Sequence, residues 1–394
     1  MPPIYLDYNA TTPIRPEVLD AMLPCLRTHF GNPSSLHQVG RRAKQALEEA
    51  REQVAGLIHA KPAEVLFTSG GTESNNLALS GIAEGLLQTR ECKNAHIITT
   101  GIEHSSVLET ATVLGSQKIL GSQEVTLTTL PVDAAGRLSP DDLEAALRPD
   151  TVVVSIGLAN HEIGTLQPIR ELSRITHAHG VPLHVDAVQA AGKLPLDVDQ
   201  LGVDALSLSA HKIYGPKGIG ALYMRTGTAL HPVFRGGPQE REKRPGTENV
   251  AAAVGFGTAA GLAGQDIETQ AARLIHLIAL LWNGIQSHIP DVVRHTPMQT
   301  CLPNTLNVGF MGASGEGLMM GLDLAGIAVS TGSACAAGSV EPSHVLQALG
   351  CDEAGAKSAI RFSAGMHTTE EEIAQVLEVL PQIVERVRKA SRTM

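Results

Sequence analysis

The chain has 394 residues, 43% of them hydrophobic and 18% charged, a composition that excludes intrinsic disorder and is sufficient for a large buried core. The 40 acidic and 30 basic residues give a formal net charge of −10, which argues against nucleic acid or an anionic membrane as the main partner. The N-terminus has no secretory pattern and no apolar run is long enough to span a bilayer, so we expect a cytoplasmic protein.

Helical and strand patterns alternate along the first two thirds of the chain. Apolar residues at steps of three and four predict a long amphipathic helix over residues 36–57. Short apolar runs predict strands at Glu64 to Thr68, Ala95 to Thr100, Thr151 to Leu158, Val181 to Val185, Asp204 to Ser209 and Gly220 to Met224. Their alternation with helices, without internal repeats, favours an α/β fold with a mainly parallel sheet.

The pattern changes after about residue 260. A helix is predicted near Ala271 to Ile285, with short strands at Asn304 to Phe310 and Ile360 to Phe362. The last helix begins at Thr369, which has capping-box spacing to Glu372. We therefore expect an N-terminal arm (1–15), a large domain (16–260) and a small C-terminal domain (261–394).

Polar groups follow several strands at the end where parallel sheets bind ligands. The turn Thr68 to Asn76 carries Gly71 and Thr72 before a helix, so its amides and hydroxyl can hold a phosphate, although most such turns are only turns. His104 follows a strand and can stack on an aromatic cofactor or move protons. Most histidines are structural or merely exposed, and only its position distinguishes this one.

Lys212 and Asp186 follow two consecutive strands and are the most informative pair in the chain. A lysine can form an imine with an aldehyde cofactor, and an aspartate can keep a pyridine ring protonated, which together are the minimal equipment of a pyridoxal-phosphate enzyme. A surface lysine and a helix-capping aspartate are the plainer alternative. Ser209 and His211 add phosphate donors beside the lysine, and they favour the cofactor site.

These motifs resemble those of the NifS/IscS-type cysteine desulfurases, fold type I pyridoxal-phosphate enzymes of the class V aminotransferase family. The resemblance runs from Tyr5 through the last helix. Its markers are Tyr5 to Pro13, Gly31 to Ser35, Thr68 to Asn76, Glu103-His104, Glu162 to Gly164, His184 to Ala187, Ser209 to Gly220, Gly236 to Glu240, Arg244 to Thr247 and Ser330 to Cys335. The resemblance implies a large domain with a mainly parallel seven-stranded sheet flanked by helices, and a smaller α+β domain.

The resemblance also implies a role for each matching residue. Lys212 would bind the cofactor covalently and move the substrate α-proton, and Asp186 would pair with the ring nitrogen. The other implied cofactor contacts are Gln189 on the ring hydroxyl, His104 stacked on the ring, and Gly71, Thr72, Ser209 and His211 around the phosphate. Thr247 matches a threonine that reaches the partner's phosphate, which implies a homodimer.

One position departs from the family pattern. His161 stands where the family usually has an asparagine that contacts the ring hydroxyl, and Asn160 lies one residue earlier. Either His161 takes over that bond, or the local backbone shifts and Asn160 makes it. The residues alone leave this choice open.

Two further residues gain a role only through the resemblance. Arg361 matches the clamp for the substrate carboxylate, a task that suits a planar guanidinium, whereas alone it reads as a surface arginine. Cys335 matches the cysteine that takes up sulfur as a persulfide; alone, it reads equally well as a small buried hydrophobe. The five cysteines are scattered with no close pair, which suggests neither disulfides nor a metal site.

The implied reaction converts L-cysteine to L-alanine and leaves the sulfur on Cys335, for delivery to an acceptor or scaffold protein in iron-sulfur cluster or other sulfur-compound biosynthesis. A selenocysteine or cystine lyase would share the cofactor site without depending on Cys335. A scaffold without enzymatic activity is a weaker alternative, because the lysine, aspartate and arginine are all present.

Overall fold

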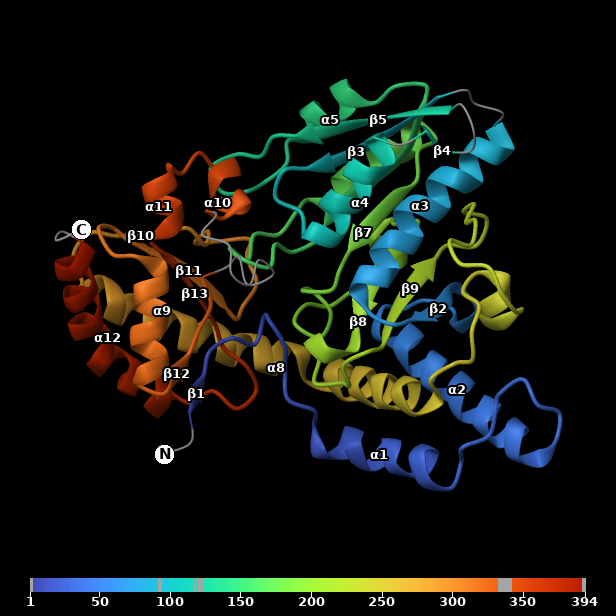
Figure 1. The fold of residues 1–394 in the computed structure, drawn as a ribbon, viewed down its shortest axis with the longest axis horizontal. Helices are drawn as coiled ribbons and strands as arrows, with labels where there is room; N and C mark the ends of the chain where they lie inside the picture. The colour runs from blue at the N-terminus through green and yellow to red at the C-terminus, as the bar shows by residue number, and fades with distance from the viewer. Residues whose placement is uncertain (1–2, 91–93, 117, 120–122, 332–341, 392–394) are drawn as a thin grey trace.

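The computed structural model describes residues 3–90, 94–116, 118–119, 123–331 and 342–391, which form a large and a smaller α/β body (Figure 1). The larger body is built on an eight-stranded sheet of order β2-β9-β8-β7-β6-β3-β5-β4. Its strands are β2 (Val65–Thr68), β3 (Asn94–Thr100), β4 (Lys118–Ile119), β5 (Gln123–Leu130), β6 (Thr151–Gly157), β7 (Leu183–Asp186), β8 (Ala205–Ser209) and β9 (Gly220–Met224).

The mainly parallel sheet is confirmed. Strands β5, β3, β6, β7 and β8 are parallel to one another, and β9 runs antiparallel between β8 and β2. The implied sheet of seven strands gains an eighth, because the two-residue β4 pairs antiparallel with β5 at one edge. Four of the predicted strands, β3, β6, β7 and β8, bring their carboxyl ends to the same edge.

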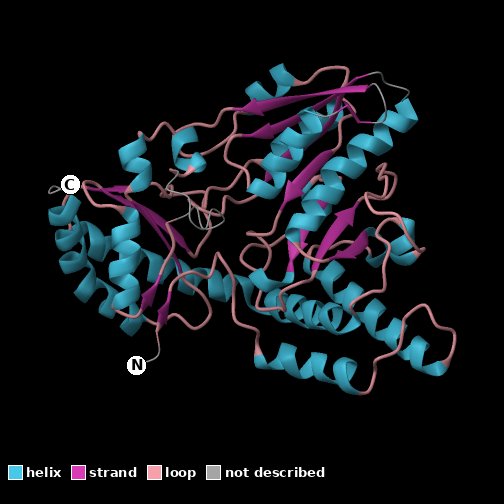
Figure 2. Ribbon diagram, viewed as in Figure 1, coloured by secondary structure: helices cyan, strands magenta, loops and turns pink. Residues whose placement is uncertain are grey.

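Helices cover both faces of this sheet (Figure 2). Ile97 belongs to a core cluster with α3 (Gly71–Arg90) and α4 (Ser105–Ser116), while its neighbour Ile98 belongs to a cluster with α2 (Gln38–Leu57) and α6 (Ile169–Ala178). Because side chains alternate along a strand, apolar neighbours can enter opposite layers only in a sheet that is buried on both sides. Burial on both faces therefore explains why the strand segments of the sequence are apolar throughout.

A single helix, α8 (Val250–His288), crosses the predicted domain boundary at residue 260. The sequence predicted a helix only near residues 271–285, because residues 250–264 are rich in glycine. These glycines allow close packing: a Cβ added at Gly257 would lie 2.7 Å from Ala50 Cα, and one at Gly255 would lie 2.6 Å from Met22 Sδ. They therefore let α8 lie directly against α1 (Pro16–Arg27) and α2.

The smaller body packs α9 (Gly315–Leu324), α12 (Glu370–Ser391) and the second half of α8 around a three-stranded antiparallel sheet of β10 (Val292–Arg294), β11 (Thr305–Phe310) and β13 (Ala359–Ser363). Near the N-terminus, β1 (Ile4–Tyr5) pairs with β12 (Ile327–Ala328). The capping box of α12 is present, since Thr369 N donates to Glu372 and Glu372 N donates to Thr369.

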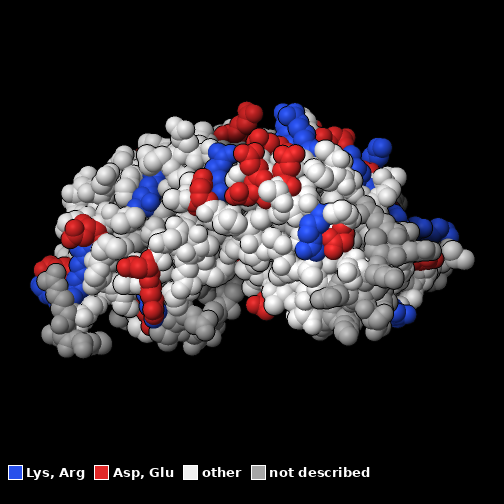
Figure 3. All heavy atoms as spheres, turned by 90° about the horizontal axis from the view of Figure 1, so that it is seen from above, with Lys and Arg blue, Asp and Glu red and all other residues white. Residues whose placement is uncertain are grey.

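The remaining elements are short. They are η1 (Pro62–Glu64), α5 (Pro140–Ala146), α7 (Val198–Leu201), η2 (Ala210–Lys212), η3 (Gln239–Glu242), α10 (His344–Ala348) and α11 (Glu353–Lys357). Among the helices described, none combines the length and apolar character needed to cross a membrane. On the face drawn in Figure 3, the Lys and Arg side chains form small groups among acidic ones.

A buried ion pair holds η3 against the large body. Arg51 Nη1 and Nη2 donate to the two carboxylate oxygens of Glu240 at 2.7 and 2.8 Å, and the backbone N of Phe67 donates to the same carboxylate at 2.9 Å. Glu240, Arg241 and Glu242 all have positive φ, a conformation that L-residues rarely adopt. The ion pair therefore stabilises a strained loop as well as joining α2 to it.

We expect Glu240→Gln to lower the free energy of unfolding by about 3 kcal/mol, because it removes the buried counter-charge of Arg51 and leaves only the half-exposed Glu48. Urea denaturation of the cofactor-free protein measures this. The matched control is Glu242→Gln in the same loop, where the side chain is exposed and the expected change is within about 0.5 kcal/mol. Equal stability of the two variants would contradict the assigned role of the ion pair.

Candidate active site

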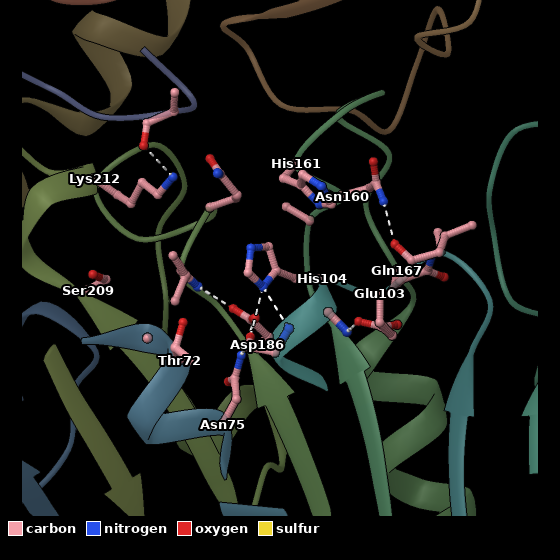
Figure 4. A pocket seen from close by; sticks show the side chains of 18 of the residues that line it. Thr72, Asn75, Glu103, His104, Asn160, His161, Gln167, Asp186, Ser209 and Lys212 are labelled. Carbon is pink, nitrogen blue, oxygen red and sulfur yellow. Dashed lines mark hydrogen bonds between the residues drawn. The ribbon is translucent and has the colours of Figure 1, made fainter. Parts of the chain in front are cut away.

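A cavity of about 300 Å³ opens at the carboxyl ends of β3, β6, β7 and β8 (Figure 4). Ten of the residues predicted for the site line it: Gly71, Thr72, His104, Asn160, His161, Asp186, Gln189, Ser209, His211 and Lys212. These residues are spread over positions 71–212 of the sequence, and the parallel strands bring them to one edge of the sheet. Ala10, Asn75, Glu103, Ser106 and Gln167 also line the cavity, although the sequence analysis gave none of them a role.

Lys212 lies in η2, immediately after β8, and the N-terminal arm holds its amine. Its Nζ donates to Ala10 O at 2.9 Å and also to Asn9 O. Asn9 O accepts a second bond from Gln189 Nε2 at 2.9 Å. The arm therefore positions two of the predicted cofactor contacts at once.

Asp186, the last residue of β7, has both carboxylate oxygens in hydrogen bonds. Oδ1 accepts from Val188 N at 3.0 Å and Oδ2 accepts from Asn75 Nδ2 at 2.7 Å. Asn75 Nδ2 also donates to Ser106 Oγ at 2.8 Å, and that hydroxyl lies 2.8 Å from His104 Nδ1. A chain of hydrogen bonds thus connects the carboxylate to the histidine, with Asn75 at its centre.

The sequence analysis missed Asn75, although it lies within the turn that was singled out. Its position three residues after Thr72, in the first turn of α3, was a signal that both side chains face the same ligand. Asn75 Oδ1 is buried and has no hydrogen-bond partner among the described residues. Such an atom is unusual in a folded protein and marks a place where a ligand or water can bind.

His104 is a neutral imidazole with a defined tautomer. Burial lowers its pKa, the Asp186 charge opposes this, and the Lys212 charge adds to it. Its Nδ1 accepts from Ser106 N at 3.1 Å, so the ring proton lies on Nε2. The ring packs edge-on to that of His161, with centroids 5.3 Å apart.

Asn160 and His161 are neighbours with different surroundings. Asn160 Oδ1 accepts from the backbone N of Glu162 and Ile163 at 2.9 and 3.0 Å, and its Nδ2 donates to Ile102 O at 2.8 Å. Both ends of this amide therefore shape the turn. The imidazole of His161 lines the cavity beside His104, and burial holds its pKa well below the usual value, so it is neutral.

The other end of the cavity collects donors at the start of α3. Thr72, Ser209 and His211 border an adjoining hollow there, and Gly71 has no room for a side chain, since an added Cβ would lie 2.7 Å from a Val188 methyl. Hydroxyls and free helix amides suit a phosphate. Together with Asp186, which lines the same cavity, these donors fit a molecule that carries both an anionic group and a protonated ring nitrogen.

Arg361, on β13, is buried just outside the cavity. Its Nη1 donates to His161 O at 3.0 Å and its Nη2 to Asp7 Oδ1 at 2.7 Å, while its Nε is buried without a hydrogen-bond partner among the described residues. The His161 backbone thus connects this arginine to the cavity wall. Thr247 is exposed and does not line the cavity, and Cys335 lies outside the described residues.

Glu103 is a second residue that the sequence analysis quoted only as a motif marker. It is buried, and its carboxyl accepts from Thr100 Oγ1 at 2.6 Å and from Gly157 N at 2.7 Å. Burial, together with the nearby Asp186 charge, raises its pKa to about 8 against the opposing bonds from Thr100 and Gly157. A carboxyl that is protonated at neutral pH therefore lies on the cavity wall.

Comparisons with known proteins all point to one family. Residues 4–376 match the aminotransferase class-V family. The chain is 49% identical over 388 residues to cysteine desulfurase IscS of Dictyoglomus turgidum, covering 98% of this chain and 96% of the relative. It is 45% identical to cysteine desulfurase IscS of Methanosarcina thermophila, covering 98% and 93%.

Two solved structures are similar along most of the chain. A NifS-like protein superposes with a TM-score of 0.89 at 38% identity, covering 98% of this chain and 100% of the other. SspA in complex with cysteine superposes with a TM-score of 0.78 at 37% identity, covering 91% and 98%.

The raised pKa of Glu103 predicts a pH dependence of stability. Between about pH 5 and 8 the unfolded chain loses a proton that the folded protein keeps, so this residue lowers the free energy of unfolding as pH rises. Glu103→Gln removes this titrating group, so the free energy of unfolding should fall less steeply with pH over this range. Denaturation measured at a series of pH values tests this. Glu109→Gln, exposed on α4, is the control. An unchanged slope in Glu103→Gln would show that the carboxyl is ionised throughout.

Proposed function

The chain belongs to the aminotransferase class-V family, among its NifS/IscS-type cysteine desulfurases, and from this we infer that it is a pyridoxal-phosphate enzyme that takes sulfur from L-cysteine and leaves L-alanine. The observation that carries this proposal is the placement of Lys212 and Asp186 on one cavity, at the ends of neighbouring parallel strands. An amine and a carboxylate in this arrangement suit the aldehyde and the ring nitrogen of this cofactor.

The residues that would hold the cofactor divide by chemistry. The amides at the start of α3, with Thr72, Ser209 and His211, would bind the phosphate. Asp186 would accept the ring N–H, and Asn75 keeps that carboxylate oriented. The neutral His104 would stack on the ring.

We assign the family's ring-hydroxyl contact to His161 together with Gln189. The Asn160 amide is engaged at both ends in its own turn, whereas the His161 imidazole lines the cavity. Gln189, in the turn that follows β7, also lines the cavity. A neutral imidazole can donate or accept a hydrogen bond at this oxygen, as the two ends of an asparagine amide can.

Once bound, the cofactor supplies an electron sink for bond breaking at the substrate α-carbon. Lys212 takes the α-proton, and the carbonyl groups of Asn9 and Ala10 hold its amine in place. His104, whose proton lies on Nε2, can donate a hydrogen bond to a thiolate sulfur in the cavity and so stabilise the anion that the attack on the substrate sulfur requires.

Cys335 would receive the sulfur. Its thiolate attacks the substrate sulfur, so that an S–S bond forms and the C–S bond breaks. The electron pair of that bond stays with the substrate carbon, which is protonated to give alanine. The persulfide sulfur would pass to an acceptor protein or a reductant, with iron-sulfur clusters among the possible products.

Arg361 would bind the substrate carboxylate. The support is its buried Nε, which has no hydrogen-bond partner among the described residues, and its bond to the backbone of His161, a cavity residue. Asp7 holds one arm of the guanidinium. The substrate carboxylate would therefore meet an arginine that is already oriented, and would share it with Asp7.

A homodimer and a cytoplasmic location also belong to this proposal. Thr247 is exposed and outside the cavity of its own chain, which suits a residue that serves a second copy. The acidic net charge and the patterns of the chain favour the cytoplasm over a membrane or nucleic-acid surface.

The deciding experiment follows alanine and sulfide release from L-cysteine by the cofactor-loaded enzyme, with mass detection of a persulfide at Cys335. We expect Cys335→Ala to lose at least about 100-fold in sulfide release while keeping the visible cofactor band, and Lys212→Ala to lose both. Cys301→Ala is the matched control and should keep full activity. Full cysteine turnover by Cys335→Ala would favour a selenocysteine or cystine lyase, and a colourless protein after cofactor addition would favour a scaffold.

Mixed dimers test whether Thr247 acts across subunits. Lys212→Ala and Thr247→Asp, each inactive alone, are co-expressed with different tags, and the heterodimer is isolated. If Thr247 completes the site of the partner subunit, one of the two sites of the heterodimer is intact, and we expect about half the wild-type activity. If Thr247 serves its own chain, neither site is intact, and the heterodimer stays inactive.

A further inference from the structure

Lys193 is a cation near the active site that the proposed reaction does not use. It lies seven residues after Asp186, and its Nζ donates to both oxygens of Gln189, the side-chain Oε1 and the backbone O, each at 3.0 Å. The charged groups that act on it are Lys212 and Arg361, which are both cationic. A lysine held among carbonyl and amide oxygens, without a counter-charge, is unusual inside a protein.

A second cavity, of about 240 Å³, lies on the other side of Lys212 and is lined by Lys193. The ionisable side chains on its wall are Tyr8, Arg15, Lys193, Lys212 and Tyr214, and no carboxylate is among the described residues that line it. Burial, together with the charges of Lys212 and Arg361, lowers the pKa of Lys193 to about 7. Nothing on this wall therefore compensates the lysine.

The bonds of Lys193 determine which way the Gln189 amide points. The amine donates to the amide oxygen, which therefore faces Lys193. The amide nitrogen consequently faces Asn9 O, to which it donates at 2.9 Å. Only one of its two N–H groups is used there, and Gln189 lines the main cavity, so the second N–H is available to a ligand.

We propose that Lys193 is a positioning residue that fixes Gln189 with its amide nitrogen toward the cofactor and, when protonated, places a positive charge behind Lys212, and that it thereby controls the proton equilibrium of the bound cofactor. This inference rests on the proposed function, because it assumes that pyridoxal phosphate occupies the main cavity. A donor at the ring oxygen and a nearby positive charge would both favour the ionised form of the bound cofactor. Removing Lys193 weakens both effects.

The test compares Lys193→Met, Lys193→Arg and wild type, with Lys44→Met as control on the exposed face of α2. Two quantities are measured: the dissociation constant for pyridoxal phosphate added to cofactor-free protein, and the pH midpoint of the visible band of the loaded enzyme. We expect Lys193→Met to raise the midpoint by about one pH unit and to weaken cofactor binding about tenfold. Lys193→Arg keeps the charge and the donors and should restore both values, and Lys44→Met should match wild type.

The outcomes separate this inference from the function on which it rests. A midpoint and an affinity in Lys193→Met equal to those of wild type would overturn the positioning role. Weaker binding with an unchanged midpoint would overturn it too, since a packing defect alone gives that result. If Lys193→Met does not fold, Lys193→Gln, which is neutral but polar, should still raise the midpoint. Wild-type protein that binds no pyridoxal phosphate would overturn the proposed function itself.

Discussion

The whole arrangement depends on Asn9, a buried residue of the N-terminal arm that is hydrogen-bonded to both bodies of the molecule. Toward the large body, its carbonyl accepts from Lys212 and Gln189. Toward the small body, its amide nitrogen donates to Thr305 Oγ1 at 2.9 Å and its backbone N donates to Ser363 Oγ at 2.9 Å. Because all these groups are buried, a lost partner would leave a polar atom unsatisfied, which costs about 1–3 kcal/mol.

The burial of its histidines determines the electrostatic character of the site. The imidazoles of His104, His161 and His211 all have lowered pKa values, with burial as the main cause in each. They are therefore neutral at physiological pH. Lys212 lines the cavity and Arg361 lies just outside it, so the site attracts the phosphate and carboxylate groups of its ligands without a ring of charged histidines.

The sequence predicted most of the site because its chemistry follows the ends of apolar strands. Lys212, Asp186 and His104 could be singled out by that rule alone, and the mainly parallel sheet then brings them together. The role of Arg361 was predicted only through the family resemblance, since the sequence alone does not distinguish a buried arginine from a surface arginine. The role of Cys335, which lies outside the described residues, rests on the resemblance throughout.

What the sequence could not predict depends on distant contacts. Asn75, Glu103 and Lys193 matter through partners that only the folded chain brings near them. The start of α8 was missed because glycine disfavours helices in isolation, whereas here tight packing against α2 requires it. The short strand β4 has too few residues to give a pattern.

Helix α8 also restricts how this chain can change. Its first half, with Phe256 and Ala259, packs in the large core, and its second half, with Leu277 and Leu281, packs in the small one. Adding one residue between the halves would turn one core relative to the other by about 100° and move it by about 1.5 Å along the axis. Arg361 would then lose its bond to the backbone of His161. The number of residues in this helix is therefore constrained as tightly as the identity of any residue in the site.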